Sequence, residues 1–365
     1  MHSNSLQVAA PEDADLRRTD DVDVIHEQHR SVLAVLGNAS RHYQGALASS
    51  PEALQYLRSR GIHRDALRKF AIGYARPVWR DLHRVFRDHQ DDAVEGSGLI
   101  VHKDGNPDGV GFDRFRNRIM FPIRDASGCV IGFGGRTLSQ EESFYAKYMN
   151  SPDSPIFHKR DVLYGLYEGR DAIEHAGSAT VVEGYLDVVQ LAQQGFANTV
   201  ATMGTACTHD QLESVLTYTN DLTFCFDGDD AGVRAADAAM QTVLPFATDY
   251  RTIRFVFLPD GHDPDSLCQE RGAAGWREAQ ARSVSLQHRI VARVNDGVEL
   301  RYAEGRARLL HQARAIWRAL PAGVVKEELL DYCCNVSAMS REEVVDLWTP
   351  MRGLGRAFER QSAAN

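Results

Sequence analysis

Acidic side chains separated by glycines form three short groups in the middle of the chain. Glu183 and Asp187 lie in EGYLD, Asp227 and Asp229 lie in DGDDAG, and residues 260–265 read DGHDPD. Carboxylates this dense repel one another, and water screens them weakly in a cleft. A hard cation relieves the repulsion. Oxygen ligands without an accompanying Cys or His pair favour magnesium or manganese over zinc.

The same residue types also cap helices and form turns. Asp and Gly are common at helix N-caps and tight turns, and a single Asp-Gly-Asp favours that structural interpretation. Three groups at three successive strand ends favour a site instead, because α/β sheets place their ligands at the carboxyl ends of strands.

The flanking segments predict alternating strands and helices. The predicted helices cover Leu186–Gln194, His209–Tyr218 and Asp230–Phe246, and Thr208 and Gln211 have capping-box spacing. Apolar runs predict four strands: Ala179–Val182, Asn198–Thr202, Leu222–Phe226 and Ile253–Leu258. This βαβα order predicts a parallel sheet covered by helices, with the acidic groups at one edge.

A basic segment precedes this region. Arg114, Arg116 and Arg118 alternate, so on a strand they would line one face, which suits a phosphate backbone. Lys147 lies between aromatic residues, a pattern that suits single-stranded nucleic acid. The alternative is a solvated arginine face with core aromatics. Residues 118–124 and 129–133 predict two strands joined by a turn.

Charge is divided unevenly in this chain of 365 residues and net charge −9. Residues 110–160 hold eight Lys/Arg and five Asp/Glu, a balance of +3, whereas residues 180–270 hold fourteen Asp/Glu and three Arg, a balance of −11. A metal site facing a polyanion needs such a division, although solvated faces produce it too. The six scattered cysteines argue against a disulfide framework or a zinc ribbon and indicate a reduced cytosol.

The two ends of the chain are less informative. Residues 1–20 are polar and acid-rich and predict a disordered tail. Apolar residues then recur at helical spacing from Val22 to Ala48, and Pro51 suits a helix start. The end, from Arg301, predicts helices with a break at 321–323. No run of about 18 apolar residues and no secretory signal is evident.

The acidic and basic motifs together resemble one family. VEGYLDVV (182–189), FDGDDAG (226–232) and FLPDGHDPD (257–265) resemble the Toprim signatures of DnaG-type bacterial primases. RFRNR running into MFPIR (114–124), GFGGR (132–136), KYMNSP (147–152) and IFHK (156–159) resemble the N-terminal half of the primase polymerase domain. Ala146 departs from the family, where proline is frequent. The resemblance extends from about residue 26 to 340.

The resemblance implies an α/β fold, α+β overall. It implies a Toprim-type parallel sheet with flanking helices over 176–275, a mixed α+β, nucleic-acid-binding subdomain over 21–175, a small helical bundle over 276–350 and a tail over 351–365. Glu183, Asp227 and Asp229 match the catalytic acids, and the metal-binding positions are Glu183, Asp187, Asp227, Asp229, Asp263 and Asp265. Positions that bind nucleic acid or nucleotide are Arg114, Arg116, Arg136, Lys147, Asn150 and Lys159.

The implied activity is template-directed synthesis of short RNA primers from ribonucleoside triphosphates on single-stranded DNA, with two Mg²⁺ or Mn²⁺ ions. Glu183 would act as a ligand or in proton transfer. No zinc is expected, because no Cys precedes Cys129, and the helicase-binding domain is not visible. A replicative helicase or a zinc-binding module would therefore act in trans. The alternatives are a Toprim-family nuclease and a catalytically weak primase-like binding protein.

Overall fold

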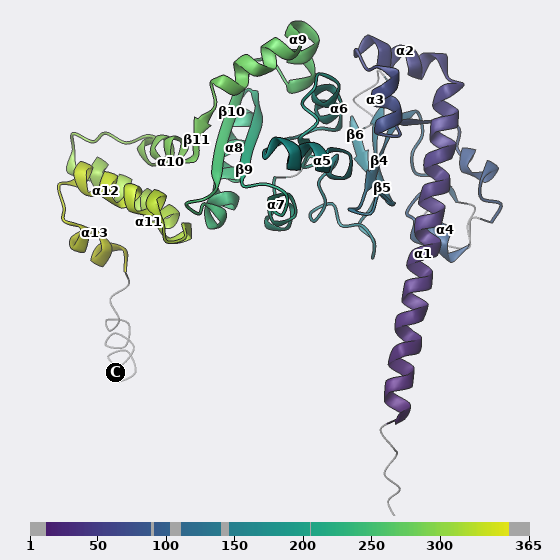
Figure 1. Ribbon diagram of the computed structural model, residues 1–365, viewed down its shortest axis with the longest axis horizontal. Coiled ribbons are helices and arrows are strands. Elements are labelled where there is room, and N and C mark those ends of the chain that lie inside the picture. The colour runs from purple at the N-terminus through teal and green to yellow at the C-terminus, as the bar shows by residue number, and fades with distance from the viewer. Residues whose placement is uncertain (1–11, 89–90, 103–110, 140–145, 205, 350–365) are drawn as a thin grey trace, which may run out of the picture. The chain divides into compact units, whose positions relative to one another are not determined.

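The computed structural model describes residues 12–88, 91–102, 111–139, 146–204 and 206–349, with side-chain surroundings from residue 27 onward. The chain divides into two compact units, one up to Glu168 and one from Gly169 (Figure 1). The division expected at 175 and 275 stays a prediction.

The first unit begins with a long helix. Helix α1 (Glu12–Ala48) is followed by α2 (Pro51–Ser59) and α3 (Arg64–Lys69), and Pro51 starts α2 as expected. Residues 12–20 belong to α1, and the disordered tail expected over 1–20 stays a prediction. Residues 1–11 and the predicted tail from 351 lie outside the described residues.

A four-stranded antiparallel sheet forms the centre of this unit, in the order β1-β4-β5-β6. Its central hairpin joins β4 (Arg118–Arg124) to β5 (Val130–Thr137), which confirms the two strands and turn read from the sequence. The edge strands are β1 (Gly73–Ala75) and β6 (Tyr148–Asn150). A separate ribbon pairs β2 (Ile100–Val101) with β3 (Phe112–Asp113).

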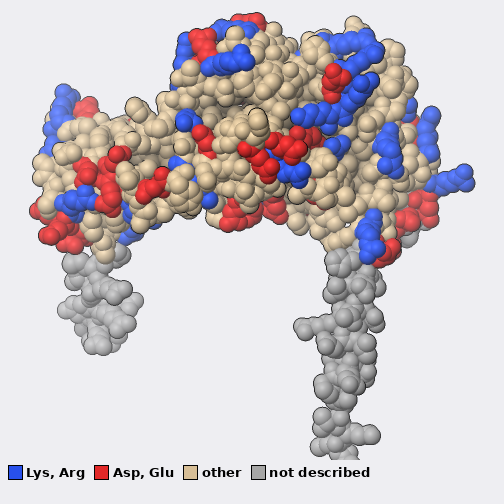
Figure 2. Space-filling model, viewed as in Figure 1, with Lys and Arg blue, Asp and Glu red and all other residues tan. Residues whose placement is uncertain are grey.

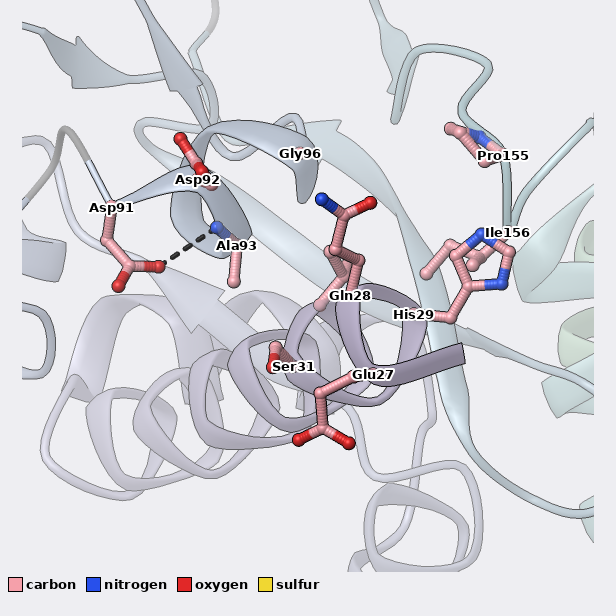
Figure 3. Close-up of a pocket in the computed structure, with 11 residues that line it drawn as sticks. Glu27, Gln28, His29, Ser31, Asp91, Asp92, Ala93, Gly96, Pro155 and Ile156 are labelled. Atoms are coloured by element: carbon pink, nitrogen blue, oxygen red, sulfur yellow. Dashed lines mark hydrogen bonds between the residues drawn. The ribbon is translucent and has the colours of Figure 1, made fainter. Parts of the chain in front are cut away.

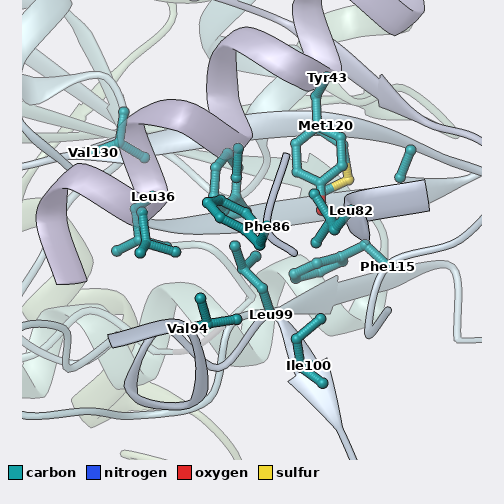
Figure 4. Packing of buried hydrophobic residues seen from close by; sticks show 14 residues of the cluster. Leu36, Tyr43, Leu82, Phe86, Val94, Leu99, Ile100, Phe115, Met120 and Val130 are labelled. Atoms are coloured by element: carbon teal, nitrogen blue, oxygen red, sulfur yellow. The ribbon is translucent and has the colours of Figure 1, made fainter. Parts of the chain in front are cut away.

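Helix α1 packs its apolar stripe against this sheet (Figure 4). Leu36 and Tyr43 are buried at helical spacing, and the Tyr43 ring meets Phe133 of β5 edge to face, 5.4 Å between centroids. Two short helices, η1 (Asp81–Arg84) and α4 (Asp92–Gly96), bring Leu82 and Val94 into the same core. Phe115 anchors the connection between β3 and β4 in this core, and Arg114 and Arg116 lie on either side of it in the sequence.

The second unit contains a five-stranded sheet in the order β11-β10-β9-β7-β8. Strands β7 (Ala179–Val182), β8 (Thr199–Ala201), β9 (Asp221–Gly228) and β10 (Thr252–Asp260) are parallel, as predicted, and β11 (Val284–Ser285) pairs antiparallel with β10. The chain runs from β7 outward to β8 and then back to β9 on the other side of β7. Such a reversal of strand order is where open α/β sheets bind ligands.

Helices connect these strands. They are α5 (Leu166–Ala176), α6 (Tyr185–Gln193), α7 (His209–Leu216), α8 (Asp230–Val243), the short η3 (Leu244–Phe246) and α9 (Pro264–Ala281). The capping box of α7 is confirmed, because Thr208 Oγ1 accepts from Gln211 N at 3.2 Å and Gln211 Oε1 accepts from Thr208 N.

Four further helices close the unit: α10 (Leu286–Asn295), α11 (Ala303–Ala319), α12 (Val324–Ser337) and α13 (Arg341–Trp348). The predicted break at 321–323 separates α11 from α12. Trp348 is buried and its indole Nε1 donates to Leu310 O at 2.9 Å, which fixes α13 on α11. Basic and acidic side chains intermingle on the face of these helices in Figure 2.

Candidate metal centre and nucleic-acid surface

The three acidic groups meet at one edge of the parallel sheet. Val181 of β7 pairs with Phe224 of β9, and Phe226 of β9 pairs with Phe257 of β10. Parallel strands end at the same edge, so Glu183 just beyond β7 and Asp227 near the end of β9 lie side by side there. We call the carboxylates at positions 183, 187, 227, 229, 263 and 265 the acidic edge.

Helices α6, α8 and α9 begin at this edge. Asp229 is the N-cap of α8 and its Oδ1 accepts from Gly232 N at 2.7 Å, while Asp263 caps α9 by accepting from Ser266 N at 2.7 Å. The positive ends of three helix dipoles therefore point at the carboxylates and offset part of their repulsion. Asp229 and Asp263 are therefore both helix N-caps and members of the acidic edge.

Two members of the acidic edge are buried and bonded internally. Asp187 Oδ2 accepts from Gly184 N at 3.0 Å, and its Oδ1 accepts from Asp265 N at 3.2 Å. Asp265 Oδ1 accepts from Gln269 Nε2 at 2.7 Å. Burial, and then the charges of Asp263, Asp227 and Asp265, raise the pKa of Asp187 well above its usual value. Through its hydrogen bonds, the side chain of Asp187 connects the loop after β7 to the start of α9.

The remaining acids face outward. Glu183 and Asp227 are half-buried and Asp229 is exposed. Burial, followed by the charge of Asp229, raises the pKa of Glu183. The charge of Asp229 therefore reaches Glu183, and the all-oxygen chemistry of these side chains fits a hard divalent cation.

Tighter carboxylate packing occurs elsewhere in the unit. Within the described residues, three groups bring their ligand atoms within 4.8 Å of one another, and these are the exposed His209, Asp210 and Glu213 of α7. The acidic edge is more open than that. It borders a cavity of about 260 Å³ whose lining includes Glu183, Thr202, Cys207, Phe224 and Ala239.

Glycines allow the loops of the edge to approach. A Cβ on Gly228 would lie 2.1 Å from Pro259 O, and one on Gly232 would lie 2.2 Å from Asp227 O. Gly228 N donates to His262 O at 3.2 Å, which joins the loop after β9 to the loop after β10. Any side chain at position 228 would push these loops apart.

The arginines of the basic segment do not line one strand face, which corrects the sequence prediction. Strand β3 ends at Asp113, and Asn117 takes a left-handed φ of 52°, so only Arg118 lies on a strand. Arg114 Nε donates to Gly98 O at 2.7 Å, and Arg118 is buried and donates to Gly135 O and Ala146 O. Burial lowers the pKa of both guanidinium groups.

The other predicted basic positions differ in exposure. Arg136 on β5 is buried, with Nη1 donating to Tyr148 Oη at 2.6 Å and its guanidinium 5.6 Å from the Tyr56 ring centroid. Lys147 is exposed just before β6, where Asn150 pairs with Gly134 of β5. Lys159 is half-buried, and its backbone N–H donates to Asp153.

The structure adds an aromatic residue that sequence reasoning missed. The side chain of Trp79 is 63% exposed, and the Arg116 guanidinium lies 4.4 Å from its ring centroid. Phe112 meets the indole edge to face at 5.3 Å and lies 5.1 Å from the same guanidinium. We call Trp79, Phe112 and Arg116 the aromatic stack. A lone Trp in an irregular segment has no periodicity that would have revealed it.

A larger cavity of about 580 Å³ lies between α1, α4 and Pro155–Ile156 in the same unit (Figure 3). Its lining includes Gln28, His29 and Asp92, and none of the residues that the sequence predicted for the site. The acidic edge and the surface formed by the aromatic stack and Lys147 therefore remain the candidate functional features.

Three family models match the chain. Residues 180–268 match a Toprim-like model, so the parallel sheet and its acidic edge form a Toprim-type domain, a class that binds divalent metal. Residues 42–170 match the N-terminal domain of the DNA primase catalytic core. Residues 290–342 match the DnaB-helicase binding domain of primase.

Known primases are similar over most of the chain. A DNA primase of Neisseria meningitidis is 41% identical over 269 residues, which is 73% of this chain and 44% of that protein. A solved DNA primase domain from Pseudomonas aeruginosa is 36% identical with a TM-score of 0.81, covering 87% of this chain and 99% of that one. A DnaG primase catalytic domain bound to ssDNA has the same identity and coverage and a TM-score of 0.80.

The chain belongs to the family of bacterial DnaG-type primase catalytic cores. It spans about half the length of the curated relatives that it matches, between 44% and 56%. The match over residues 290–342 corrects the expectation that no helicase-binding domain is present. The sequence pattern predicted only helices here, because amphipathic periodicity indicates which face of a helix is buried and not which partner its exposed face binds.

The described residues contain no helix that is both long enough and apolar enough to cross a membrane. The six cysteines are all free.

Proposed function

We propose that this chain is a DNA-directed RNA polymerase of the primase type, which synthesises short RNA primers on single-stranded DNA. The observation that carries the proposal is the convergence of Glu183, Asp227 and Asp229 at adjacent strand ends, beside helix N-termini. Membership of the primase family and the ssDNA-bound relative support the same substrate.

Glu183, Asp227 and Asp229 would hold two divalent cations, Mg²⁺ or Mn²⁺. When bound, such ions supply Lewis-acid stabilisation of the transferring phosphate and lower the pKa of the attacking 3′-hydroxyl. Asp263, at the N-cap of α9, borders this set. Asp187 and Asp265 belong to the metal-binding acids of the family pattern. Their oxygens already accept hydrogen bonds inside the fold, so we assign them to holding the outward carboxylates in place.

The nucleic-acid surface belongs to the first unit. Lys147 offers an exposed cation beside β6, and the aromatic stack offers an exposed indole face backed by a guanidinium. Stacking on an aromatic face and cation contact with phosphate are the usual means of binding single strands. Arg114, Arg136, Asn150 and Lys159 complete the family positions for template and nucleotide, with Arg114 and Arg136 shaping the surface through internal bonds.

The C-terminal helices would contact a replicative helicase. Helices α11 and α13 border a groove of about 460 Å³ whose lining includes Arg306, His311, Arg314, Leu347 and Trp348. Leu347 is 57% exposed, so the groove presents an apolar residue between basic ones.

The first test is primer synthesis on single-stranded DNA with ribonucleotides and Mg²⁺. Asp227→Ala and Asp229→Ala should each abolish product. Asp227→Ala should leave the fold intact or slightly more stable, because like-charge repulsion is relieved without metal. Asp229→Ala also loses the N-cap hydrogen bond from Gly232 N and should be destabilised by about 1 kcal/mol. Asp230→Ala is the matched control, since it removes one exposed carboxylate from the next position on α8.

Normal primer synthesis by Asp227→Ala would show that the metal assignment is wrong. Degradation of the DNA by the parent chain, without primer formation, would identify a Toprim-type nuclease instead.

A further inference from the structure

Trp79 lies in a segment that has no regular structure of its own. It follows β1 and precedes η1, with its indole largely in solvent. An exposed side chain on an irregular segment is ordinarily mobile unless other groups fix its backbone. The question is therefore what holds the indole over the Arg116 guanidinium.

Asp113, at the end of β3, bonds to both ends of this turn. Its backbone N–H donates to Trp79 O at 2.8 Å, and its side-chain Oδ2 accepts from Leu82 N at 3.0 Å. The residue is 1% exposed, so both bonds are shielded from water. Residues 79–82 are thus fastened to β3 at two points by one residue.

The same residue also fixes the other partner of the stack. Arg116 Nη1 donates to the Asp113 carbonyl oxygen, and its guanidinium lies 4.4 Å from the Trp79 ring centroid and 5.1 Å from that of Phe112. The N–H, the carbonyl and the carboxylate of Asp113 each bond to a different part of the assembly. Its backbone and side chain together determine how the indole and the guanidinium face each other.

Stability alone does not account for a carboxylate at this position. Within the described residues Asp113 Oδ1 has no hydrogen-bond partner, and burial raises the pKa of the side chain to about 6 against the opposing effect of the Leu82 and Asp81 N–H groups. An incompletely bonded carboxylate costs stability in an apolar core. The nearby Asp81, in contrast, meets His42 and Arg76 at 2.8 and 2.9 Å.

We propose that Asp113 is a positioning residue that holds Trp79 and Arg116 together as a preformed stacking face for a base of the single-stranded template. This inference rests on the proposed function, because that function assigns the aromatic stack to nucleic-acid binding. Preorganisation of this kind saves the cost of ordering the side chains during binding.

The test is a double-mutant cycle on binding of an oligo-deoxythymidine single strand at fixed salt. Trp79→Ala should weaken binding roughly tenfold, the usual effect of losing one aromatic stack. Asp113→Ala should lose most of the same factor, and the double variant should be no weaker than Trp79→Ala alone, because the two residues act as one unit. Asp113→Asn keeps an oxygen that accepts from Leu82 N and should restore binding.

Acrylamide quenching of Trp79 fluorescence gives a readout that general destabilisation does not change. The fluorescence of each variant is measured with and without the additional substitution Trp79→Phe. Subtracting the second signal from the first removes the contribution of the other three tryptophans. Asp113→Ala should increase quenching of Trp79, whereas Asp113→Asn should not. Phe86→Leu is the control, since it weakens the same core without touching Asp113 and should leave quenching and DNA affinity unchanged.

The outcomes separate the inference from the proposed function. Parent-like binding by Trp79→Ala would remove the aromatic stack from the DNA-binding surface and overturn this inference, whereas the proposed function would be overturned only by failure of primer synthesis in the parent chain. Loss of binding by Trp79→Ala, with parent-like binding and quenching by Asp113→Ala, would overturn the positioning role alone. The positioning role would also be overturned if the affinity losses of Trp79→Ala and Asp113→Ala multiplied in the double variant, because the two residues would then act independently.

If Asp113→Ala does not fold, amide hydrogen exchange in the unaltered chain tests the positioning role of Asp113. The two bonds to residues 79–82 require the Leu82 and Asp113 amides to be protected as strongly as those of β4 and β5. Fast exchange at both amides would contradict the positioning role.

Discussion

Two buried carboxyl groups of the first unit are compensated differently. Asp81 loses hydration on burial, but hydrogen bonds from His42 and Arg76 more than offset this, so its pKa is lowered. For Asp113, burial has the larger effect and outweighs the N–H groups of Leu82 and Asp81 and the charge of Arg116, so its pKa rises to about 6. Asp81 contributes stability as an anion, whereas Asp113 costs stability once it ionises.

The raised pKa of Asp113 predicts a pH dependence of stability. An ordinary aspartate has a pKa of 3.8, so between that value and about 6 the folded chain binds more protons than the unfolded one. The contribution of Asp113 is therefore most favourable below pH 4 and is lost as pH rises through 6. Relative to Asp113→Asn, the parent should lose at most about 3 kcal/mol of unfolding free energy between pH 4 and 7.

Urea unfolding of the parent and of Asp113→Asn at several pH values measures this difference. His42, Tyr43, Asp81 and Arg116 also face or border Asp113, and they are present in both proteins, so their titration largely cancels in the comparison. Parallel curves for the two proteins across this range would refute the assignment.

At the scale of elements, the strands and helices of the Toprim-type domain were predictable to within a few residues. Apolar runs ended by an acidic residue and Gly mark β7, β9 and β10 clearly, since parallel strands are apolar on both faces. Convergence of the acidic groups then follows from topology. The division between the outward Glu183 and the buried Asp187 was not predictable, because it depends on how far α6 turns from the strand.

The basic segment was predicted less well because alternating arginines occur both on one face of a strand and in irregular connections. Alternating arginines fit one face of a strand, but the left-handed φ of Asn117 ends the extended chain before β4. Arg114 and Arg118 then turn inward to backbone carbonyls, and Arg116 alone reaches the exposed indole. A hydrophobic periodicity reports neither a single turn nor a cation–aromatic contact.

This arrangement predicts different effects for two cations of the first unit. Lys147→Ala should reduce primer synthesis severely, roughly a hundredfold, because Lys147 matches a nucleic-acid- or nucleotide-binding position of the family, where an exposed cation would stabilise phosphate charge. Arg116→Ala should mainly weaken DNA binding and reduce its logarithmic salt slope by about one, since one phosphate-neutralising charge and the support of Trp79 are lost.

Steady-state kinetics and DNA binding between low and moderate salt distinguish the two effects. Arg64→Ala, which removes an exposed arginine from α3, is the control for net charge and should change neither quantity. Equal and salt-independent losses at Lys147 and Arg116 would argue against a polyanion surface.

At the scale of the whole molecule, negative charge exceeds positive by nine, while residues 110–160 have a balance of only +3. Several of these arginines are also committed to internal hydrogen bonds. Few cations therefore remain for phosphates, and few phosphate contacts mean weak binding with only a shallow dependence on salt. Positioning a single strand for initiation demands more of such a surface than extending a primer that is already paired.

We therefore predict that the chain initiates primers poorly and with little sequence preference, and extends a pre-annealed RNA primer more readily. A zinc-binding module supplied in trans, or a helicase engaged by the C-terminal helices, should raise initiation far more than extension, because either would hold the template for it. The measurement is the ratio of de novo initiation to extension at fixed salt, with and without each partner. Asp227→Ala gives the background, since it should do neither. Efficient, start-site-specific initiation by the chain alone would contradict the prediction and would assign template selection to surfaces of the chain itself.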